Sequence, residues 1–453
     1  MASRATAKLL SVIKPEDASF SETWNTLCDR STTPDQDVEA RVREIVANVK
    51  AQGDTALKSL VKSATGANLK KLEVTREEWD EACDAVDPGD RAAIGKAAMR
   101  IRAFHRKRIP SSWEMREEGG AYMGQRVRPL DTVGIYLPKT EGLRPTSVIM
   151  YATPASVVEV QEIILTAAPE KNGKISPEIL MAARVAGVHR VFKVGGAPAI
   201  AAMAMGTDEV PRVDKIVGPG ELEASTAKRL LMGSVGVDSE IGASELCIVA
   251  DTSATPAWIA ADIISQAERA ENSQQILITH SKPLATRVQE QITKQLKTLD
   301  RADVATKALS DRGAIIVTKS LGKSLELANE YAPERLVLAV KDSEIVHKQV
   351  RNAGAVFLGH YTPVAVGDYL AGPNHALPTG GGARFLSPLS VEDFLKRTAF
   401  LRFEPPKLRE LGAEVMRLAD VEGVAGPGRS VDLRLQKIRR VRREREAARE
   451  AEL

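Results

Sequence analysis

The chain has 453 residues, a formal net charge of +3 at pH 7, 43% hydrophobic residues and 27% charged residues. These fractions are those of an ordinary globular protein and argue against a disordered chain. No apolar run approaches the roughly 20 residues that a membrane span needs. Because single hydrophobic cores rarely grow past roughly 250 to 300 residues, we expect more than one domain.

The three cysteines, Cys28, Cys83 and Cys247, are scattered and odd in number. This pattern argues against a disulfide framework and favours a reducing compartment. Residues 1–10 contain basic residues and no acid, but they lack the apolar core of a signal peptide. We therefore expect a cytoplasmic protein with no membrane partner.

Apolar residues recur at helical spacing over residues 34–64 and 76–105, which predicts an N-terminal helical part within residues 1–131. From Thr132 onwards, short apolar runs ended by Gly or Pro alternate with Ala-rich helices. The predicted strands form two series, 133–137, 162–166, 191–194 and 215–217, then 246–250, 273–279, 313–317 and 355–358. This alternation predicts an α/β fold with parallel sheets and ligands in a cleft between two units.

Long collinear blocks of sequence also carry a resemblance to a known family. The blocks are residues 123–130, 133–138, 215–220, 371–381 and 389–396. From about residue 20 to about residue 435, the chain resembles the histidinol dehydrogenases, zinc enzymes that oxidise an amino alcohol to an amino acid in two NAD-dependent steps. The resemblance implies two incomplete Rossmann-like domains, a small C-terminal segment that crosses to a second subunit, and a homodimer.

On this basis we expect five segments along the chain. Residues 1–131 are the N-terminal helical part of the first domain, and 132–243 form the second Rossmann-like domain. The remainder of the first domain is 244–388, followed by a dimerisation segment, 389–435, and a charged tail, 436–453. Acids interleave with the bases of this tail, which favours a solvated, partly helical segment over a nucleic-acid partner.

The family's zinc is held by a Gln and a His three residues apart on one helix, by an Asp and by a C-terminal His. Here Gln266 and Asp368 match, whereas Arg269 and Pro427 stand where the two histidines are expected. Arginine donates no lone pair, and glutamine with one carboxylate offers little donor strength to a transition metal. The sequence therefore argues against zinc binding and leaves Gln266 and Asp368 as a vestigial pair of ligand positions. His360 and His375 lie near Asp368 in the sequence and are candidates to rebuild a metal site, but we interpret His360 as a surface loop residue.

The family's catalytic pair is Glu-His, and here it is Glu334 followed by Arg335. Because arginine stays charged at any working pH, Glu334 is the remaining candidate base, provided that burial raises its pKa. The alternative is that Glu334 only pairs with Arg335 or Arg269. The predicted substrate-binding residues, which match or occupy the family's positions, are Ser244, Gln266, Arg269, Asp368, His375 and Glu422.

Only some of the family's NAD-contacting positions are matched in this chain. Tyr136 matches a family NAD contact, but Pro198 and Glu221 replace a Gln and an Asn, and a glutamate repels a pyrophosphate. We expect NAD as cofactor, with binding weakened. Arginines in place of neutral histidines lead to the hypothesis of a small anionic substrate, if Arg269 and Arg335 both face the cleft.

Three functions remain open at this point. The first is an NAD-dependent, metal-independent oxidoreductase acting on a different small hydroxy or amino substrate. The second is a true L-histidinol dehydrogenase of histidine biosynthesis with unusual site residues. The third is a non-catalytic paralogue that binds a metabolite or serves as a scaffold. The sequence favours the first.

Overall fold

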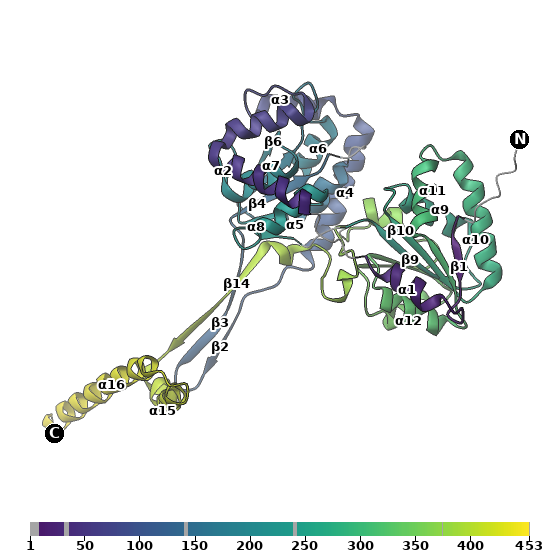
Figure 1. The fold of residues 1–453 in the computed structure, drawn as a ribbon. Coiled ribbons are helices and arrows are strands. Elements are labelled where there is room, and N and C mark those ends of the chain that lie inside the picture. Colours follow the sequence, from purple (N-terminus) through teal and green to yellow (C-terminus); the bar gives the residue numbers. More distant parts are fainter. Residues whose placement is uncertain (1–8, 31–35, 140–143, 239–241, 374, 453) are drawn as a thin grey trace, which may run out of the picture. The chain divides into compact units, whose positions relative to one another are not determined.

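The computed structural model describes residues 9–30, 36–139, 144–238, 242–373 and 375–452. The chain divides into two compact units, one made of Met1–Ile109 with Pro129–Phe394, the other of Pro110–Arg128 with Leu395–Leu453. The larger unit is built on two parallel α/β sheets (Figure 1), which confirms the predicted fold class.

The first sheet has five strands in the order β6-β5-β4-β7-β8, and every neighbouring pair is parallel. All four strands predicted for the first series are present, and β8 is added at the edge. The bounds are β4 (Thr132–Leu137), β5 (Glu162–Ala167), β6 (Arg190–Phe192), β7 (Lys215–Val217) and β8 (Gly236–Val237).

The helices predicted in the N-terminal region pack around this first sheet. They are α2 (Gln36–Thr65), α3 (Arg76–Ala85) and α4 (Pro88–Arg106), and they contact α5 (Pro145–Val157), α6 (Pro177–Ala186), α7 (Gly196–Met205) and α8 (Leu222–Leu231). Val42 and Leu57 of α2 share one buried cluster with Tyr136 and Ile200. The N-terminal helices therefore complete the core around residues 132–243, rather than that of residues 244–388 as the sequence analysis assumed.

The second sheet has six parallel strands in the order β1-β11-β10-β9-β12-β13. Their bounds are β1 (Ser11–Ile13), β9 (Glu245–Ala250), β10 (Gln274–Thr279), β11 (Ala314–Val317), β12 (Arg335–Ala339) and β13 (Ala355–Leu358). The four predicted strands are confirmed. Two were missed, namely β1 and β12, so the N-terminal part of the chain is not wholly helical.

Helices cover both faces of this sheet (Figure 1). Leu246 and Ile248 of β9 pack towards α9 (Pro256–Ala267), α10 (Lys282–Gln295) and α11 (Ala302–Arg312). Cys247 and Val249 share the other cluster with Trp24 of α1 (Phe20–Cys28) and with α12 (Leu321–Tyr331). Because alternate residues of a strand face opposite sides, a continuously apolar strand such as β9 is what a sheet covered on both faces requires.

The smaller unit combines an antiparallel hairpin with two helices. Strand β2 (Trp113–Glu117) pairs antiparallel with β3 (Ala121–Pro129), and β14 (Leu395–Phe403) flanks β3. This hairpin again differs from the helical N-terminal part expected from the sequence. The C-terminal helices are α15 (Pro405–Val421) and α16 (Ala425–Ala451), and α16 includes nearly all of the charged tail. Among the described residues, no helix is both long and apolar enough to cross a membrane.

Candidate active site

The catalytic and metal-site positions predicted from the sequence gather around one edge of the second sheet. Arg335 is the first residue of β12 and pairs in register with Leu246 at the start of β9. Gln266 lies in the last turn of α9, which leads back towards the start of β10, and Arg269 follows this helix. The site is therefore at the amino-terminal ends of the strands. Open α/β sheets more often bind ligands at the opposite, carboxyl-terminal edge.

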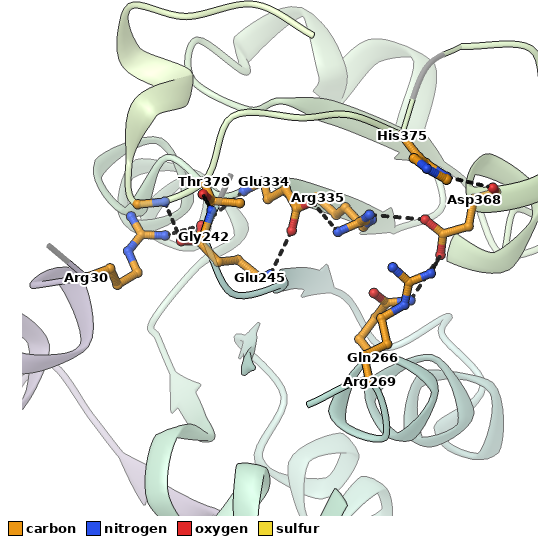
Figure 2. A network of polar contacts seen from close by, with 11 residues as sticks. Arg30, Gly242, Glu245, Gln266, Arg269, Glu334, Arg335, Asp368, His375 and Thr379 are labelled. Atoms are coloured by element: carbon orange, nitrogen blue, oxygen red, sulfur yellow. Dashed lines mark hydrogen bonds and ion pairs between the residues drawn. The ribbon is translucent and has the colours of Figure 1, made fainter. Parts of the chain in front are cut away.

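Asp368 is the centre of a buried polar cluster (Figure 2). It lies in α14 (Val364–Tyr369). Its Oδ2 accepts hydrogen bonds from Gln266 Nε2 at 3.2 Å and from Arg269 Nη2 at 2.9 Å. Its Oδ1 accepts one from Arg335 Nη2 at 3.1 Å. The structure thus brings together the two matched zinc positions and both arginines that stand at histidine positions.

Glu334 joins this cluster through Arg335. Arg335 Nη1 lies 2.5 Å from Glu334 Oε1, and both side chains are almost fully buried. Glu334 Oε2 accepts the backbone N–H of Glu245 at 2.8 Å. The pairing of Glu334 with Arg335, which was the structural alternative for this acid, is therefore present. A proton-accepting role remains compatible with it, because an ion pair does not prevent protonation.

Burial and charge move the pKa values of these acids in different directions. Burial raises the pKa of Glu334 to about 7, although the Arg335 guanidinium opposes the rise. Burial also acts to raise the pKa of Asp368, but Arg335 and Arg269 outweigh it and hold that pKa below its usual value. Two carboxylates on one guanidinium thus have pKa values shifted in opposite directions. Asp368 is a permanent anion, whereas Glu334 can exchange a proton near neutral pH.

His375 lies against the backbone of Asp368. Its Nδ1 is 2.9 Å from the Asp368 carbonyl oxygen, which accepts the hydrogen bond. Burial lowers the pKa of His375 to about 4, so the ring is neutral at physiological pH. A neutral ring whose Nδ1 carries the proton presents Nε2 as an acceptor.

A second group of contacts holds Glu245, the residue whose backbone N–H donates to Glu334. Glu245 Oε2 lies 2.5 Å from Arg30 Nη1, and its Oε1 accepts the Gly380 N–H at 2.6 Å. Thr379 Oγ1 accepts the Gly242 N–H at 2.5 Å. None of these residues was predicted from the sequence as part of the site. Thr379 lies in one of the matched blocks, Glu245 follows the predicted residue Ser244, and a glutamate opening an apolar strand is a signal for a buried charge.

The other predicted residues lie at different places. Ser244 directly precedes β9, where its carbonyl accepts the Gln274 N–H at 2.9 Å. Glu422 is the exposed C-cap of α15 in the smaller unit, so its substrate role stays a prediction. His360 follows the carboxyl end of β13, and its Nε2 lies 3.1 Å from Ser253 Oγ.

Tyr136 and Glu221, two of the predicted cofactor positions, are in direct contact. The Tyr136 hydroxyl donates to Glu221 Oε1 at 2.5 Å and accepts the Gly196 N–H at 3.2 Å. Gly196 is the first residue of α7, and Pro198 follows in the same turn. They stand at the carboxyl-terminal edge of the first sheet, where open sheets bind dinucleotides and helix N-termini attract phosphate. A helix N-terminus at this edge is the kind of backbone site that holds a dinucleotide phosphate, whereas the Glu221 carboxylate opposes a pyrophosphate.

The residues at the vestigial metal position do not fit zinc. Both carboxylate oxygens of Asp368 already accept hydrogen bonds from guanidinium groups, which cannot ligate a cation. The amide of Gln266 is the one neutral oxygen donor of the predicted ligand set, and one such donor is weak. Within the described residues, no three His, Cys, Asp or Glu side chains are grouped to hold a metal ion.

The fold and this site together define a class of protein. Two parallel α/β sheets, one with a helix that begins at Gly196 at its carboxyl edge and one with a buried acid whose pKa is near neutral, are typical of a dinucleotide-dependent oxidoreductase. The sequence profile of the family described as histidinol dehydrogenase matches residues 28–435.

Individual relatives agree with this match. A histidinol dehydrogenase of Syntrophotalea carbinolica is 43% identical, covering 94% of this chain and 100% of its own length. One of Geobacter metallireducens is 44% identical, with coverages of 93% and 97%. The crystal structure of histidinol dehydrogenase from Elizabethkingia anophelis has a TM-score of 0.91 at 31% identity, covering 96% of this chain and 100% of that one. The chain belongs to the histidinol dehydrogenase family and is an oxidoreductase acting on a CH–OH group.

Proposed function

We propose that the chain oxidises the primary alcohol of L-histidinol, or of a close amino alcohol, with NAD as hydride acceptor. The observation that carries the proposal is the match to histidinol dehydrogenases at 43% and 44% identity over 93–94% of the chain. These relatives support L-histidinol better than the different substrate that the sequence analysis favoured. Full-length similarity to enzymes also supports catalysis over the non-catalytic alternative.

Oxidation of an alcohol removes a hydride from the carbinol carbon and a proton from the hydroxyl group. NAD, when bound, supplies the acceptor for the hydride. Glu334 is the group suited to take the proton, because its pKa of about 7 lies near a working pH. Arg335 cannot take it, since its guanidinium stays protonated. We assign Arg335 a positioning role, in which it fixes the Glu334 carboxylate through the contact at 2.5 Å.

Two buried polar atoms next to Asp368 support a small polar substrate there. Among the described residues, Gln266 Oε1 and Arg335 Nε have no hydrogen-bond partner although they are buried. A buried polar atom without a partner costs about 1–3 kcal/mol, and hydroxyl or amino groups of a substrate relieve this cost. The neutral ring of His375 and the loop of Ser244 complete the proposed binding surface.

One observation favours a second candidate, a small anionic alcohol. The side chain of Arg269 is 25% exposed, so part of its guanidinium remains open to a carboxylate, sulfonate or phosphate. The original form of this hypothesis required both arginines to face the cleft. That requirement is wrong for Arg335, whose side chain is 2% exposed and directed at Glu334 and Asp368.

The test measures NADH formation with L-histidinol, with uncharged amino alcohols and with carboxylate, sulfonate and phosphate alcohols. Turnover on L-histidinol that falls on the order of 10²–10⁴-fold in Glu334→Gln supports the proposal. The matched control is Glu326→Gln, which neutralises an exposed acid paired with Lys323. Turnover on anionic alcohols alone, lost in Arg269→Ala, supports the second candidate. No turnover on any alcohol contradicts both.

We also propose that the protein is a homodimer formed through the smaller unit. Large apolar side chains are exposed along its strands and helices, with Leu401 at 74%, Leu418 at 63% and Val421 at 72%. Burying such residues against a second copy stabilises the pair by the hydrophobic effect. Light scattering of the purified chain and of Leu418→Glu tests this proposal, and a monomeric parent protein contradicts it.

A further inference from the structure

We infer that the guanidinium groups of Arg269 and Arg335 have taken the place of the metal ion as the cations that hold this site together. The inference concerns the same site as the proposed dehydrogenase, but it does not depend on turnover. It states what neutralises the buried acids Asp368 and Glu334. The chain is therefore expected to fold and function without a bound transition metal.

The first argument is geometric. Arg335 bridges two acids from different segments, since its Nη2 bonds Asp368 Oδ1 at 3.1 Å and its Nη1 lies 2.5 Å from Glu334 Oε1. Arg269 Nη2 bonds the other oxygen of Asp368 at 2.9 Å. A planar, delocalised cation with several donors suits such bridging between carboxylates. A metal ion bound by Asp368 would lie beside both guanidiniums, whose positive charges repel it.

The second argument is the charge balance of the cluster. Asp368 and Glu334 carry two negative charges when ionised, and Arg269 and Arg335 carry two positive ones. A divalent ion among neutral histidines gives the same balance, so the two arginines replace its charge in full. Adding a divalent ion to the arginine cluster leaves two positive charges uncompensated in a buried site, which is strongly unfavourable.

The third argument is rigidity. Arg335 begins β12, a strand that is paired on both sides, with β9 and with β13. Its side chain is 2% exposed, as is that of Asp368. A permanently charged group anchored on an interior strand keeps α14 and the segment before β12 together at any physiological pH. A metal ion held by histidines does the same only while those histidines are deprotonated.

The experiment measures metal content and melting temperature of the full chain without substrate or NAD. The expected result is substoichiometric zinc after purification and an unchanged Tm in the presence of EDTA or of added zinc chloride. About one tightly held zinc per chain, with a Tm that falls in EDTA, would overturn the inference. Failure to reduce NAD leaves this inference untouched and counts against the proposed function alone.

A double variant, Arg269→His/Arg335→His, restores one histidine of the family's metal set and the histidine of its catalytic pair, and it tests whether the two arginines supply the charge of the metal. Without metal its Tm should fall below that of the parent chain, and zinc chloride should raise it again. The matched control, Arg287→His/Arg312→His, changes two exposed arginines on the helices of the same sheet and should respond to neither condition. A double variant that matches the parent Tm in EDTA, or that ignores zinc, contradicts the inference.

The single variant Arg269→His covers the case in which the double variant does not fold. It keeps Arg335 with Glu334, and it alters a side chain that is already 25% exposed. It restores the histidine three residues after Gln266, in the turn that follows α9. Its Tm in EDTA should lie below that of the parent chain and should rise with zinc, and the absence of both changes contradicts the inference.

Discussion

Arg335 and Asp368 form a buried ion pair in which Nη2 lies 3.1 Å from Oδ1 and both side chains are 2% exposed. Neither charge is accessible to water, so Arg335 is compensated by Asp368 and Glu334, and Asp368 by Arg335 and Arg269. Removing Arg335 leaves Glu334 buried without its cation and leaves Asp368 with Arg269 alone. This dependence makes the pair the most sensitive point of the site to substitution.

We expect Arg335→Met to lower the free energy of unfolding by about 3–5 kcal/mol, because Asp368 and Glu334 lose their shared cation. Urea denaturation at pH 7.5 measures this loss. The control Arg43→Met removes an exposed arginine that pairs with Glu39, and such pairs contribute about 0–1 kcal/mol. The double variant Arg335→Met/Asp368→Asn should lose less than the sum of its single variants. Strict additivity contradicts the pairing.

Glu334 should make the protein less stable as the pH rises from 4.5 towards 8. Its pKa is about 7 in the folded state against a reference value of 4.5, so the folded state binds the proton more tightly. The stabilisation is full below pH 4.5 and is lost as the pH rises through 7. At about 1.4 kcal/mol per pKa unit, the loss is on the order of 3 kcal/mol.

Glu334→Gln removes this titration, so the stability of the variant relative to the parent should increase between pH 5 and pH 8. Urea denaturation at both pH values measures the difference, which is independent of any constant loss from the weakened contact with Arg335. Glu326→Gln is again the control, because that acid is exposed. Equal pH slopes for the parent chain and Glu334→Gln would show that the folded-state pKa of Glu334 is not raised.

Much of the fold followed from the sequence because buried parallel strands leave a clear pattern. Strand β9 is apolar from Leu246 to Ala250 and was predicted within one residue. Strand β12 was missed because it opens on Arg335 directly after Pro333 and Glu334, which is the pattern of a polar loop. All five residues of β2 are exposed. A strand that is not half-buried gives no alternation to detect.

The sequence predicted which residues belong to the site, but it did not predict which of them are in contact. The resemblance placed Gln266, Arg269 and Asp368 in one site, and the structure brings them into hydrogen-bond distance. It did not indicate that Arg335 bridges Asp368 and Glu334. Arg30 was missed altogether, because its contact with Glu245 joins residues 215 positions apart and depends on how the whole domain packs.

Glu221→Gln should strengthen NAD binding. Glu221 is exposed at the start of α8, and its carboxylate accepts the Tyr136 hydroxyl beside the start of α7. A carboxylate roughly 8 Å from a pyrophosphate charge, at an intermediate dielectric, costs about 1 kcal/mol, which is roughly fivefold in Kd. Isothermal titration with NAD measures the change. Glu223→Gln, on the same helix, is the control, and equal affinities for all three proteins contradict the proposed cofactor site.

Gly218→Ala should destabilise the first sheet at the carboxyl-terminal ends of its strands, where Tyr136 lies. Gly218 has φ +136°, and an added Cβ would overlap the carbonyl oxygen of Tyr136. Because that oxygen belongs to the backbone of β4, it cannot move away without disturbing the strand. We expect a loss of about 3 kcal/mol or more in the free energy of unfolding, from overpacking and strain together.

The variant Gly233→Ala separates the backbone strain expected in Gly218→Ala from its overpacking. Gly233 has φ +95°, but an added Cβ there meets no atom within 4 Å. Its expected cost is the conformational strain alone, about 1–2 kcal/mol. Urea denaturation of both variants measures the difference, and NAD titration of Gly218→Ala should show weaker binding, because Tyr136 moves with β4. Equal losses for the two variants would mean that the close approach of Gly218 to Tyr136 contributes nothing beyond its backbone angle.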